Sequence, residues 1–280
     1  MARKPTKNDT VGGLDKPAKA YTDLNFLRSR AGRPMRILAE FLEPEDRFER
    51  HNVSDTIVFF GSARIRSREV AEEALASAKK HGGDIARADQ TLLMSRYYEE
   101  ARELSRRLTE WSKGLKGRSK RFVICTGGGP GIMEAANRGA ADANGLNIGL
   151  NISLPFEQHE NPYASRELTF NFHYFFMRKF WFSYLAKAMI VFPGGYGTLD
   201  EFFELMTLVS THKMGKAMPV VLYGSEYWNE IMNLDAMVKF GTISPSDLEL
   251  FHYSDSVDDA LEFLTQKLTE YHIDKPGGVM

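Results

Sequence analysis

The feature that most constrains the fold is a recurring alternation of short apolar runs with helical sequence. The runs are almost continuously apolar, which is typical of strands buried on both faces of a parallel sheet. We expect strands at residues 56–60, 121–125, 147–150, 168–170, 188–192 and 219–223. Because helical stretches separate most of these runs, the sequence predicts an α/β fold with a mainly parallel sheet and helices on both faces.

The two ends of the chain differ from this pattern. Residues 1–20 are rich in Gly, Pro, Lys and Asp, which indicates a disordered tail. We interpret residues 21–280 as a single α/β domain with an N-terminal helical extension. Pro34 suits the first turn of the added helix, and a C-terminal helix begins near Ser256. The apolar stripe of the added helix consists of Ile37, Leu38, Phe41 and Leu42.

Charge and cysteine content exclude several classes of protein. Lys and Arg total 36 against 37 Asp and Glu, so the protein has no strong positive electrostatic potential to attract nucleic acid or an anionic membrane. The one cysteine, Cys125, excludes an intrachain disulfide and a multi-cysteine zinc site. No run is long and apolar enough to span a bilayer, and no apolar signal core follows the basic N-terminus. We expect a cytoplasmic protein that binds no metal, cofactor, nucleic acid or membrane.

A glycine-rich loop, Thr126–Glu134, connects one predicted strand to the next helix. Glycines let the backbone approach a ligand closely, and the first N–H groups of a helix attract anions. Four of the five residues 127–131 are glycine, which exceeds what a tight turn requires. A turn without a ligand is the alternative, but the composition favours phosphate binding.

A second glycine-rich loop, Phe192–Glu201, also leaves an apolar strand and opens a helix. Thr198 can cap this helix and can donate to a phosphate oxygen. A capping turn requires neither so many glycines nor Glu201, the carboxylate one turn inside the helix. Because parallel strands end at one edge of a sheet, the two loops could hold one nucleotide from two sides.

Neither loop fits the known motifs for dinucleotides or triphosphates. The G-x-G-x-x-G fingerprint fails because Ile132 and Asp200 occupy its third glycine position. The Gly-Lys-Ser/Thr of the Walker motif is missing from both loops. We therefore interpret the site as one for a single phosphate.

Charged residues lie close to these loops in the sequence. Arg178 and Lys179 are flanked by aromatic residues at the start of a predicted helix, although a solvated amphipathic helix would show the same pattern. Glu201 and Glu204 share one face of the helix after the second loop. Carboxylates at a helix start also favour the macrodipole, but the adjoining glycines indicate a functional role for Glu201.

These motifs resemble those of the LONELY GUY (LOG) family of cytokinin-activating phosphoribohydrolases. Residues 193–201 are similar to the family's P-G-G-x-G-T-x-x-E motif, and residues 127–134 resemble its other glycine loop. Residues 177–179 fall where the family carries an Arg-Lys pair, and residues 61–64 resemble its first strand-end loop. The likeness extends from about Thr56 to the C-terminus.

The additional residues at 1–50 and 82–120 make the chain resemble the longer bacterial branch, formerly labelled lysine decarboxylase-like. The resemblance implies a Rossmann-like, doubly wound fold and a homodimer or higher homo-oligomer. It implies hydrolysis of a nucleoside 5′-monophosphate, such as AMP or N6-modified AMP, to free base and ribose 5-phosphate. Arg178 and Glu201 would be catalytic. The residues implied to bind substrate or its phosphate are Ser62, Gly128, Gly129, Gly131, Met133, Lys179, Gly194, Gly195, Gly197 and Thr198.

In this interpretation Glu201 binds ribose hydroxyls, stabilises a positive sugar or activates water, and Arg178 stabilises the departing base. A non-catalytic nucleotide-binding or sensing protein is the main alternative, although it would need only the loops. A DNA-processing role, which related folds serve, conflicts with the balanced charge. A pyridoxal decarboxylase would need a Schiff-base lysine, and the motifs offer only Lys179. The sequence does not determine the base.

Overall fold

The computed structural model describes residues 19–117, 119–154 and 161–273. The chain divides into two compact units, Met1–Leu42 and Glu43–Met280. Most of the predicted tail lies outside the described residues, so the division at residue 20 stays a prediction. None of the helices in the described part of the chain combines the length and the apolar character needed to cross a bilayer.

The first unit holds two short elements and the start of a longer helix. These elements are η1 (Ala20–Thr22), α1 (Leu24–Arg28) and α2 (Arg33–Arg50). Asp23 caps α1 by accepting hydrogen bonds from the N–H groups of Asn25 and Phe26. Pro34 occupies the first turn of α2, as predicted. Leu38 and Leu42 of the predicted stripe are about half exposed.

The second unit is built on a seven-stranded sheet in the order β4-β3-β2-β1-β5-β6-β7. Every pair of neighbouring strands is parallel, which confirms the predicted doubly wound α/β fold. The strands are β1 (Thr56–Phe60), β2 (Val123–Thr126), β3 (Asn147–Ile152), β4 (Thr169–Phe172), β5 (Ala186–Val191), β6 (Val220–Tyr223) and β7 (His252–Ser254). Only β7 has no counterpart among the predicted strands, because its three residues are too short and too polar to give an apolar run.

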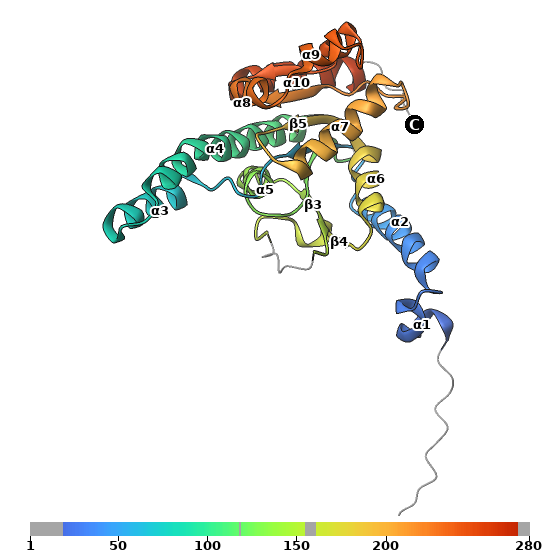
Figure 1. Ribbon diagram of the computed structural model, residues 1–280. Coiled ribbons are helices and arrows are strands. Elements are labelled where there is room, and N and C mark those ends of the chain that lie inside the picture. The colour runs from blue at the N-terminus through green and yellow to red at the C-terminus, as the bar shows by residue number, and fades with distance from the viewer. Residues whose placement is uncertain (1–18, 118, 155–160, 274–280) are drawn as a thin grey trace, which may run out of the picture. The chain divides into compact units, whose positions relative to one another are not determined.

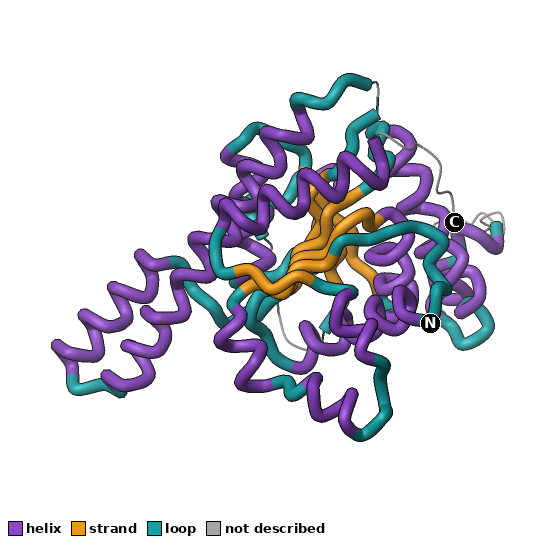
Figure 2. The backbone as a smooth tube through the Cα atoms, turned by 90° about the horizontal axis from the view of Figure 1, so that it is seen from above, coloured by secondary structure: helices purple, strands orange, loops and turns teal. Residues whose placement is uncertain are grey.

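Helices cover both faces of this sheet (Figures 1 and 2). One face of β1, with Ile57 and Phe59, belongs to a buried cluster that includes residues of α4, α5 and α10. On the other face, the ring of Phe60 packs edge-on against the ring of Phe182 of α6, with 5.1 Å between the ring centroids. The helices of the second unit are α3 (Arg68–His81), α4 (Ile85–Lys113), α5 (Ile132–Asp142), α6 (Phe175–Leu185), α7 (Tyr196–Ser210), α8 (Ser225–Ile231), α9 (Leu234–Lys239) and α10 (Val257–Leu268). The remaining short helices are η2 (Arg166–Leu168), η3 (Pro245–Glu249) and η4 (Thr269–Ile273).

Two helix ends show how local sequence sets these boundaries. Gly82 ends α3 in the left-handed conformation, with φ at 76°, and its N–H donates to the carbonyl of Ala78. The chain then reverses into the 29-residue helix α4, so that α3 and the start of α4 project from the sheet as a hairpin (Figure 2). The helix α5 ends at Asp142, and Asn144 then takes a left-handed conformation with φ at 50° that turns the chain toward β3.

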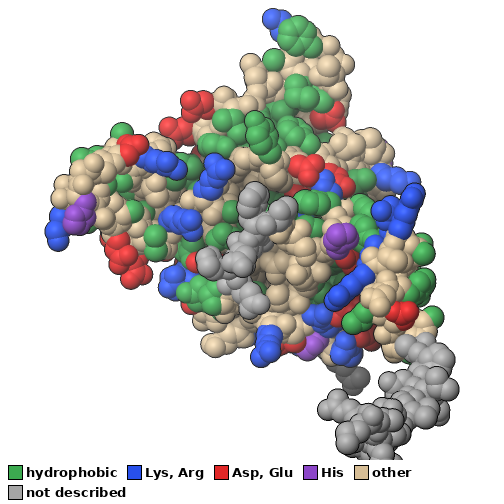
Figure 3. All heavy atoms as spheres, turned by 60° about the horizontal axis from the view of Figure 1, so that its bottom comes forward, with side chains coloured by type: hydrophobic (Ala, Val, Ile, Leu, Met, Phe, Trp, Pro, Cys, Tyr) green, Lys and Arg blue, Asp and Glu red, His purple; other side chains and the backbone are tan. Residues whose placement is uncertain are grey.

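Charges of both signs occur across the face of the molecule shown in Figure 3. This mixture matches the near-zero net charge of -1. An ion pair between a buried carboxylate and a partly buried guanidinium lies at the amino end of the strands. The carboxylate of Asp55 accepts from Nη2 of Arg121 at 2.8 Å, from its Nε at 3.0 Å and from the N–H of Phe122 at 2.6 Å.

Replacing Asp55 with alanine should lower the free energy of unfolding by about 3 kcal/mol, because it leaves a partly buried guanidinium and a buried N–H without their acceptor. Urea denaturation measures the loss. The matched control is Asp46→Ala, because Asp46 pairs with Arg50 on the exposed face of α2. That control should cost less than about 0.5 kcal/mol. Equal losses in the two variants would contradict the structural role of Asp55.

Candidate functional site

Three loops meet at the carboxyl ends of the central strands β2, β1 and β5. The N–H of Ser62, after β1, donates to the carbonyl of Pro193, after β5, at 3.0 Å. The N–H of Ile132, after β2, donates to the carbonyl of Ser62 at 3.1 Å. These bonds hold the loops around a cavity of about 570 Å³, which we call the main cavity.

Eight of the predicted site residues line the main cavity. They are Ser62, Met133, Arg178, Gly194, Gly195, Gly197, Thr198 and Glu201. Gly128, Gly129, Gly131 and Lys179 do not line it. The cavity therefore brings together eight of the twelve predicted site residues, and the lining also contains residues that the sequence did not indicate.

Two glycines of the first loop are required by the protein's own packing. Gly128 and Gly131 have φ at 67° and 73°, a conformation that other residues rarely adopt. A Cβ on Gly131 would lie 2.3 Å from the carbonyl oxygen of Ser62, and one on Gly128 would lie 2.3 Å from the side-chain amide of Asn151. Within the loop 127–131, only Gly127 lines the main cavity.

The second loop opens directly into the main cavity. Gly195 occupies the N-cap position of α7, and Thr198 is the third residue of the helix. The predicted capping role of Thr198 is therefore wrong. Thr198 instead packs against Gly194, where a Cβ would lie 2.1 Å from Oγ1 of Thr198. A Cβ on Gly195 or Gly197 would meet nothing within 4 Å. The protein's own packing therefore does not require glycine at these last two positions.

Arg178 and Glu201 form a buried ion pair at the cavity wall. Nη2 of Arg178 lies 3.4 Å from Oε1 of Glu201, and the two side chains are 15% and 7% exposed. The guanidinium lies over the ring of Phe175 at 5.1 Å and that of Phe182 at 5.6 Å. Nε of Arg178 has no hydrogen-bond partner among the described residues.

Burial opposes the charge on both members of this pair. It raises the pKa of Glu201 to about 7, although the cations of Arg178 and Lys179 favour the carboxylate. It also lowers the pKa of Arg178 despite the attraction of Glu201. The carboxyl group therefore changes its charge close to neutral pH, which is a property expected of a group that takes part in proton transfer.

Lys179 points away from the main cavity. Its Nζ lies 2.7 Å from Oδ2 of Asp200 and 2.8 Å from Oε2 of Glu204, so it joins α6 to α7. Burial opposes its charge, but hydrogen bonds to these two carboxylates outweigh that effect and raise its pKa. Lys179 therefore supports the two helices that carry Arg178 and Glu201.

Residues 133–264 match the family model described as "Possible lysine decarboxylase". The matched segment is a little less than half of the chain, and it contains Met133, Arg178 and the whole second loop. No curated protein matches the sequence.

The solved structures that resemble this one include the following two. Structural-genomics target TM1055 is 19% identical in sequence, with a TM-score of 0.46, over 76% of this chain and 99% of that chain. The Moco carrier protein from Chlamydomonas reinhardtii is 20% identical, with a TM-score of 0.44, over 77% of this chain and 99% of that chain.

The main cavity also contains residues that the motifs did not indicate. Tyr227 of α8 donates its hydroxyl hydrogen to the carbonyl oxygen of Gly194 at 2.8 Å and so fixes the second loop. Phe60, Phe182 and Ile231 add apolar walls. Tyr227 follows β6, the strand next to β5, so the rule that sites form at strand carboxyl ends could have found it. The described residues contain no cluster of three or more His, Cys, Asp or Glu able to hold a metal ion.

Proposed function

We propose that this protein hydrolyses the N-glycosidic bond of a nucleoside 5′-monophosphate, AMP or N6-modified AMP, to free base and ribose 5-phosphate. One observation carries the proposal. The glycine-lined N-terminus of α7 and the buried pair of Arg178 and Glu201 face the same cavity. Glu201 lies within the first two turns of α7, and Arg178 lies on the neighbouring helix α6. The first feature suits a phosphate, and the second suits a sugar that becomes positively charged.

The phosphate would bind at the start of α7. The N–H groups of the first helical turn are without intrahelical partners and carry the positive end of the helix dipole. Gly195 and Gly197 leave the space that phosphate oxygens need, and Thr198 and Ser62 offer hydroxyl groups on the cavity wall. Binding at this end would hold the ribose in place for the reaction.

The bond cleavage would take place at Glu201 and Arg178. As the bond between C1′ and the base breaks, its electron pair leaves with the base and the sugar gains oxocarbenium character. The carboxylate of Glu201 stabilises that positive charge and accepts a proton from the water that attacks C1′. Arg178 donates hydrogen bonds to the departing base, and the base takes up a proton from solvent. Arginine stabilises charge here and does not serve as the acid, because it holds its proton too tightly.

A lysine-based decarboxylase finds less support in the geometry. No lysine lines the main cavity, and Lys179 is held in its charged form by two carboxylates. Lys216 has a pKa lowered to about 7 by burial, but its Nζ donates to the carbonyls of Ser183 and Tyr184. A Schiff-base lysine must be both neutral and open to the substrate.

The proposal is tested by incubating the protein with a panel of nucleoside 5′-monophosphates and separating the products by chromatography. Free base and ribose 5-phosphate should appear in equal amounts, and the fastest reaction identifies the preferred base. If every nucleotide binds but stays intact, the protein is a nucleotide-binding or sensing protein. Release of carbon dioxide from lysine, without base release, would replace the proposal with a decarboxylase.

Glycine substitutions separate phosphate binding from loop packing. Gly197→Ala should raise KM for AMP about tenfold or more while leaving thermal stability unchanged or slightly higher, because only the ligand requires this space and alanine favours the helix. The matched control is Gly194→Ala, which should lower the melting temperature because its Cβ would collide with Thr198. Steady-state kinetics and thermal unfolding give both readouts. An unchanged KM in a stable Gly197→Ala protein would place the phosphate elsewhere.

The raised pKa of Glu201 predicts the pH dependence of the reaction. The group is a carboxylate above its pKa of about 7 and an uncharged acid below it. Because the charged form stabilises the sugar cation, kcat/KM for AMP should fall about tenfold for each pH unit below 7 and level off above it. A profile of kcat/KM from pH 5 to 9 measures this. A flat profile down to pH 5 would show that the ionisation of Glu201 does not control the rate.

A further inference from the structure

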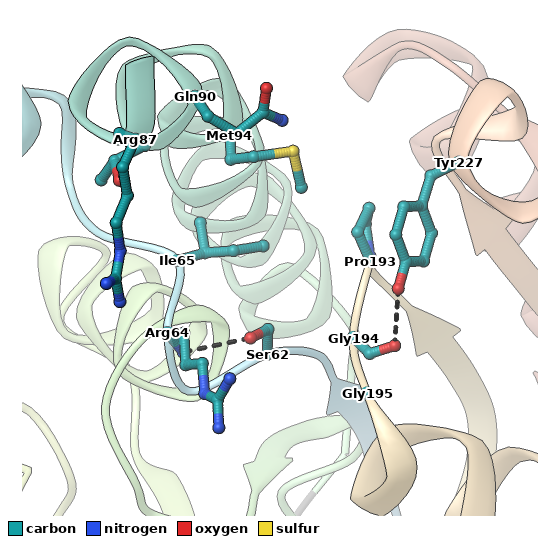
Figure 4. Close-up of a pocket in the computed structure, with 11 residues that line it drawn as sticks. Ser62, Arg64, Ile65, Arg87, Gln90, Met94, Pro193, Gly194, Gly195 and Tyr227 are labelled. Carbon is teal, nitrogen blue, oxygen red and sulfur yellow. Dashed lines mark hydrogen bonds between the residues drawn. The ribbon is translucent and has the colours of Figure 1, made fainter. Parts of the chain in front are cut away.

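A second, smaller cavity adjoins the main one, and we call it the side pocket. It measures about 420 Å³, and it shares Ser62, Arg64, Gly194, Gly195 and Tyr227 with the main cavity. Figure 4 shows Tyr227 and Gly194 on one side and the helix α4, carrying Arg87, on the other. The side pocket therefore extends from the second loop to the helix α4.

The side pocket lies at the phosphate end of the main cavity. Its wall contains Gly194 and Gly195, which open the second loop, and Ser62 from the loop after β1. Neither Arg178 nor Glu201, the groups proposed to act on the glycosidic bond, is part of its lining. A ligand that reaches this pocket from the main cavity would pass the bound phosphate, and would extend away from the ribose and the base.

The charge of the side pocket is positive. Arg64 and Arg87 line it, and no Asp or Glu does. Of the five arginines on α4, the other four form ion pairs, namely Arg96 with Glu226, Arg102 with Asp142, Arg106 with Glu103 and Glu110, and Arg107 with Asp258. Arg87 forms none among the described residues, and the same holds for Arg64. Two arginines without acidic partners therefore lie beside the loop proposed to bind phosphate, and guanidinium groups bind phosphoryl oxygens well.

We propose that the side pocket binds the second phosphoryl group of a nucleoside 5′-diphosphate, so that diphosphates occupy the site more tightly than monophosphates. This inference rests on the proposed function, because the proposed function places the first phosphate at the start of α7. The second glycine loop accommodates the first phosphate, and the arginine side chains hold the second. Nucleoside diphosphates would then compete with the monophosphate and slow its hydrolysis.

Calorimetric titration of AMP and ADP tests this inference without relying on turnover. In the Glu201→Gln protein, which should cleave AMP at least about a hundredfold more slowly, ADP should bind at least about tenfold more tightly than AMP. Adding Arg87→Ala should reduce this preference about tenfold and leave the affinity for AMP unchanged. The matched control is Arg96→Ala on the same helix, which should leave both affinities unchanged because Arg96 pairs with Glu226 at the surface. Increasing salt should weaken ADP binding more than AMP binding.

Each alternative outcome is distinct. Equal affinities for AMP and ADP, or a preference for ADP that survives Arg87→Ala, would overturn the inference. Inorganic phosphate that binds together with AMP, and depends on Arg87, would also overturn it, since the anion would then be a separate molecule. If AMP is bound but never cleaved by the unmodified protein, the proposed function fails while the comparison of ADP with AMP still decides this inference.

Discussion

Glu201→Gln is expected to lower kcat for base release by at least about a hundredfold, because glutamine cannot supply the negative charge that stabilises the sugar cation. Glutamine has nearly the same shape as glutamate and retains a carbonyl oxygen toward Arg178, so the protein should stay folded. The affinity for AMP should change little, since the phosphate is held by the start of α7. Single-turnover kinetics and a circular dichroism melt measure the rate and the fold.

The matched control for this variant is Glu204→Gln. Glu204 lies one turn further along α7 and faces Lys179 instead of the main cavity. Its replacement should change kcat by less than about threefold, because an ion pair near the surface contributes little free energy. Near-normal turnover in Glu201→Gln, or equal losses in the two variants, would contradict the catalytic role of Glu201.

Arg178→Ala should also lower kcat by at least about a hundredfold, because the departing base loses its hydrogen-bond donor. Arg178→Lys should recover only a small part of the rate, since lysine lacks the planar guanidinium that lies over Phe175 and Phe182. Free base is again measured by chromatography. Combining Arg178→Ala with Glu201→Gln should cost much less than the product of the two single effects, because the two groups act on one transition state.

Lys179→Met provides the control for Arg178, because the two residues are neighbours in sequence. Lys179 holds Asp200 and Glu204 outside the main cavity, so its loss should leave kcat within about threefold and lower stability by about 1 kcal/mol. A loss of activity equal to that of Arg178→Ala would return Lys179 to the substrate-binding residues predicted from the sequence. It would also show that the ion pairs described here do not persist during the reaction.

The sequence predicted the sheet well because its central strands are nearly all apolar. The strand β1 was predicted with its observed bounds, since Thr56–Phe60 contains only residues that favour strands and is fully buried. The weakest predictions were at the edges. The strand β7 has a partly exposed His252 and Tyr253, and its stability depends on pairing with β6, which no local pattern reveals.

The candidate site was predicted in part for a related reason. Sequence spacing places Arg178 and Lys179 together, but adjacent residues on a helix point about 100° apart. Arg178 therefore lines the cavity, and Lys179 pairs with Asp200 and Glu204 outside it. Similarly, a run of glycines does not show which of them meet a ligand and which meet the protein's own backbone. The contact of Gly131 with Ser62, and the approach of Tyr227 from α8, depend on segments distant in sequence.

A crystal structure of the Glu201→Gln protein with AMP would test the central claim most directly. We predict that the phosphate accepts hydrogen bonds from the backbone N–H groups at the start of α7, beside Gly195 and Gly197. The C1′ atom should then lie between residue 201 and the guanidinium of Arg178. A phosphate bound outside the main cavity, or a glycosidic bond that reaches neither side chain, would contradict the account.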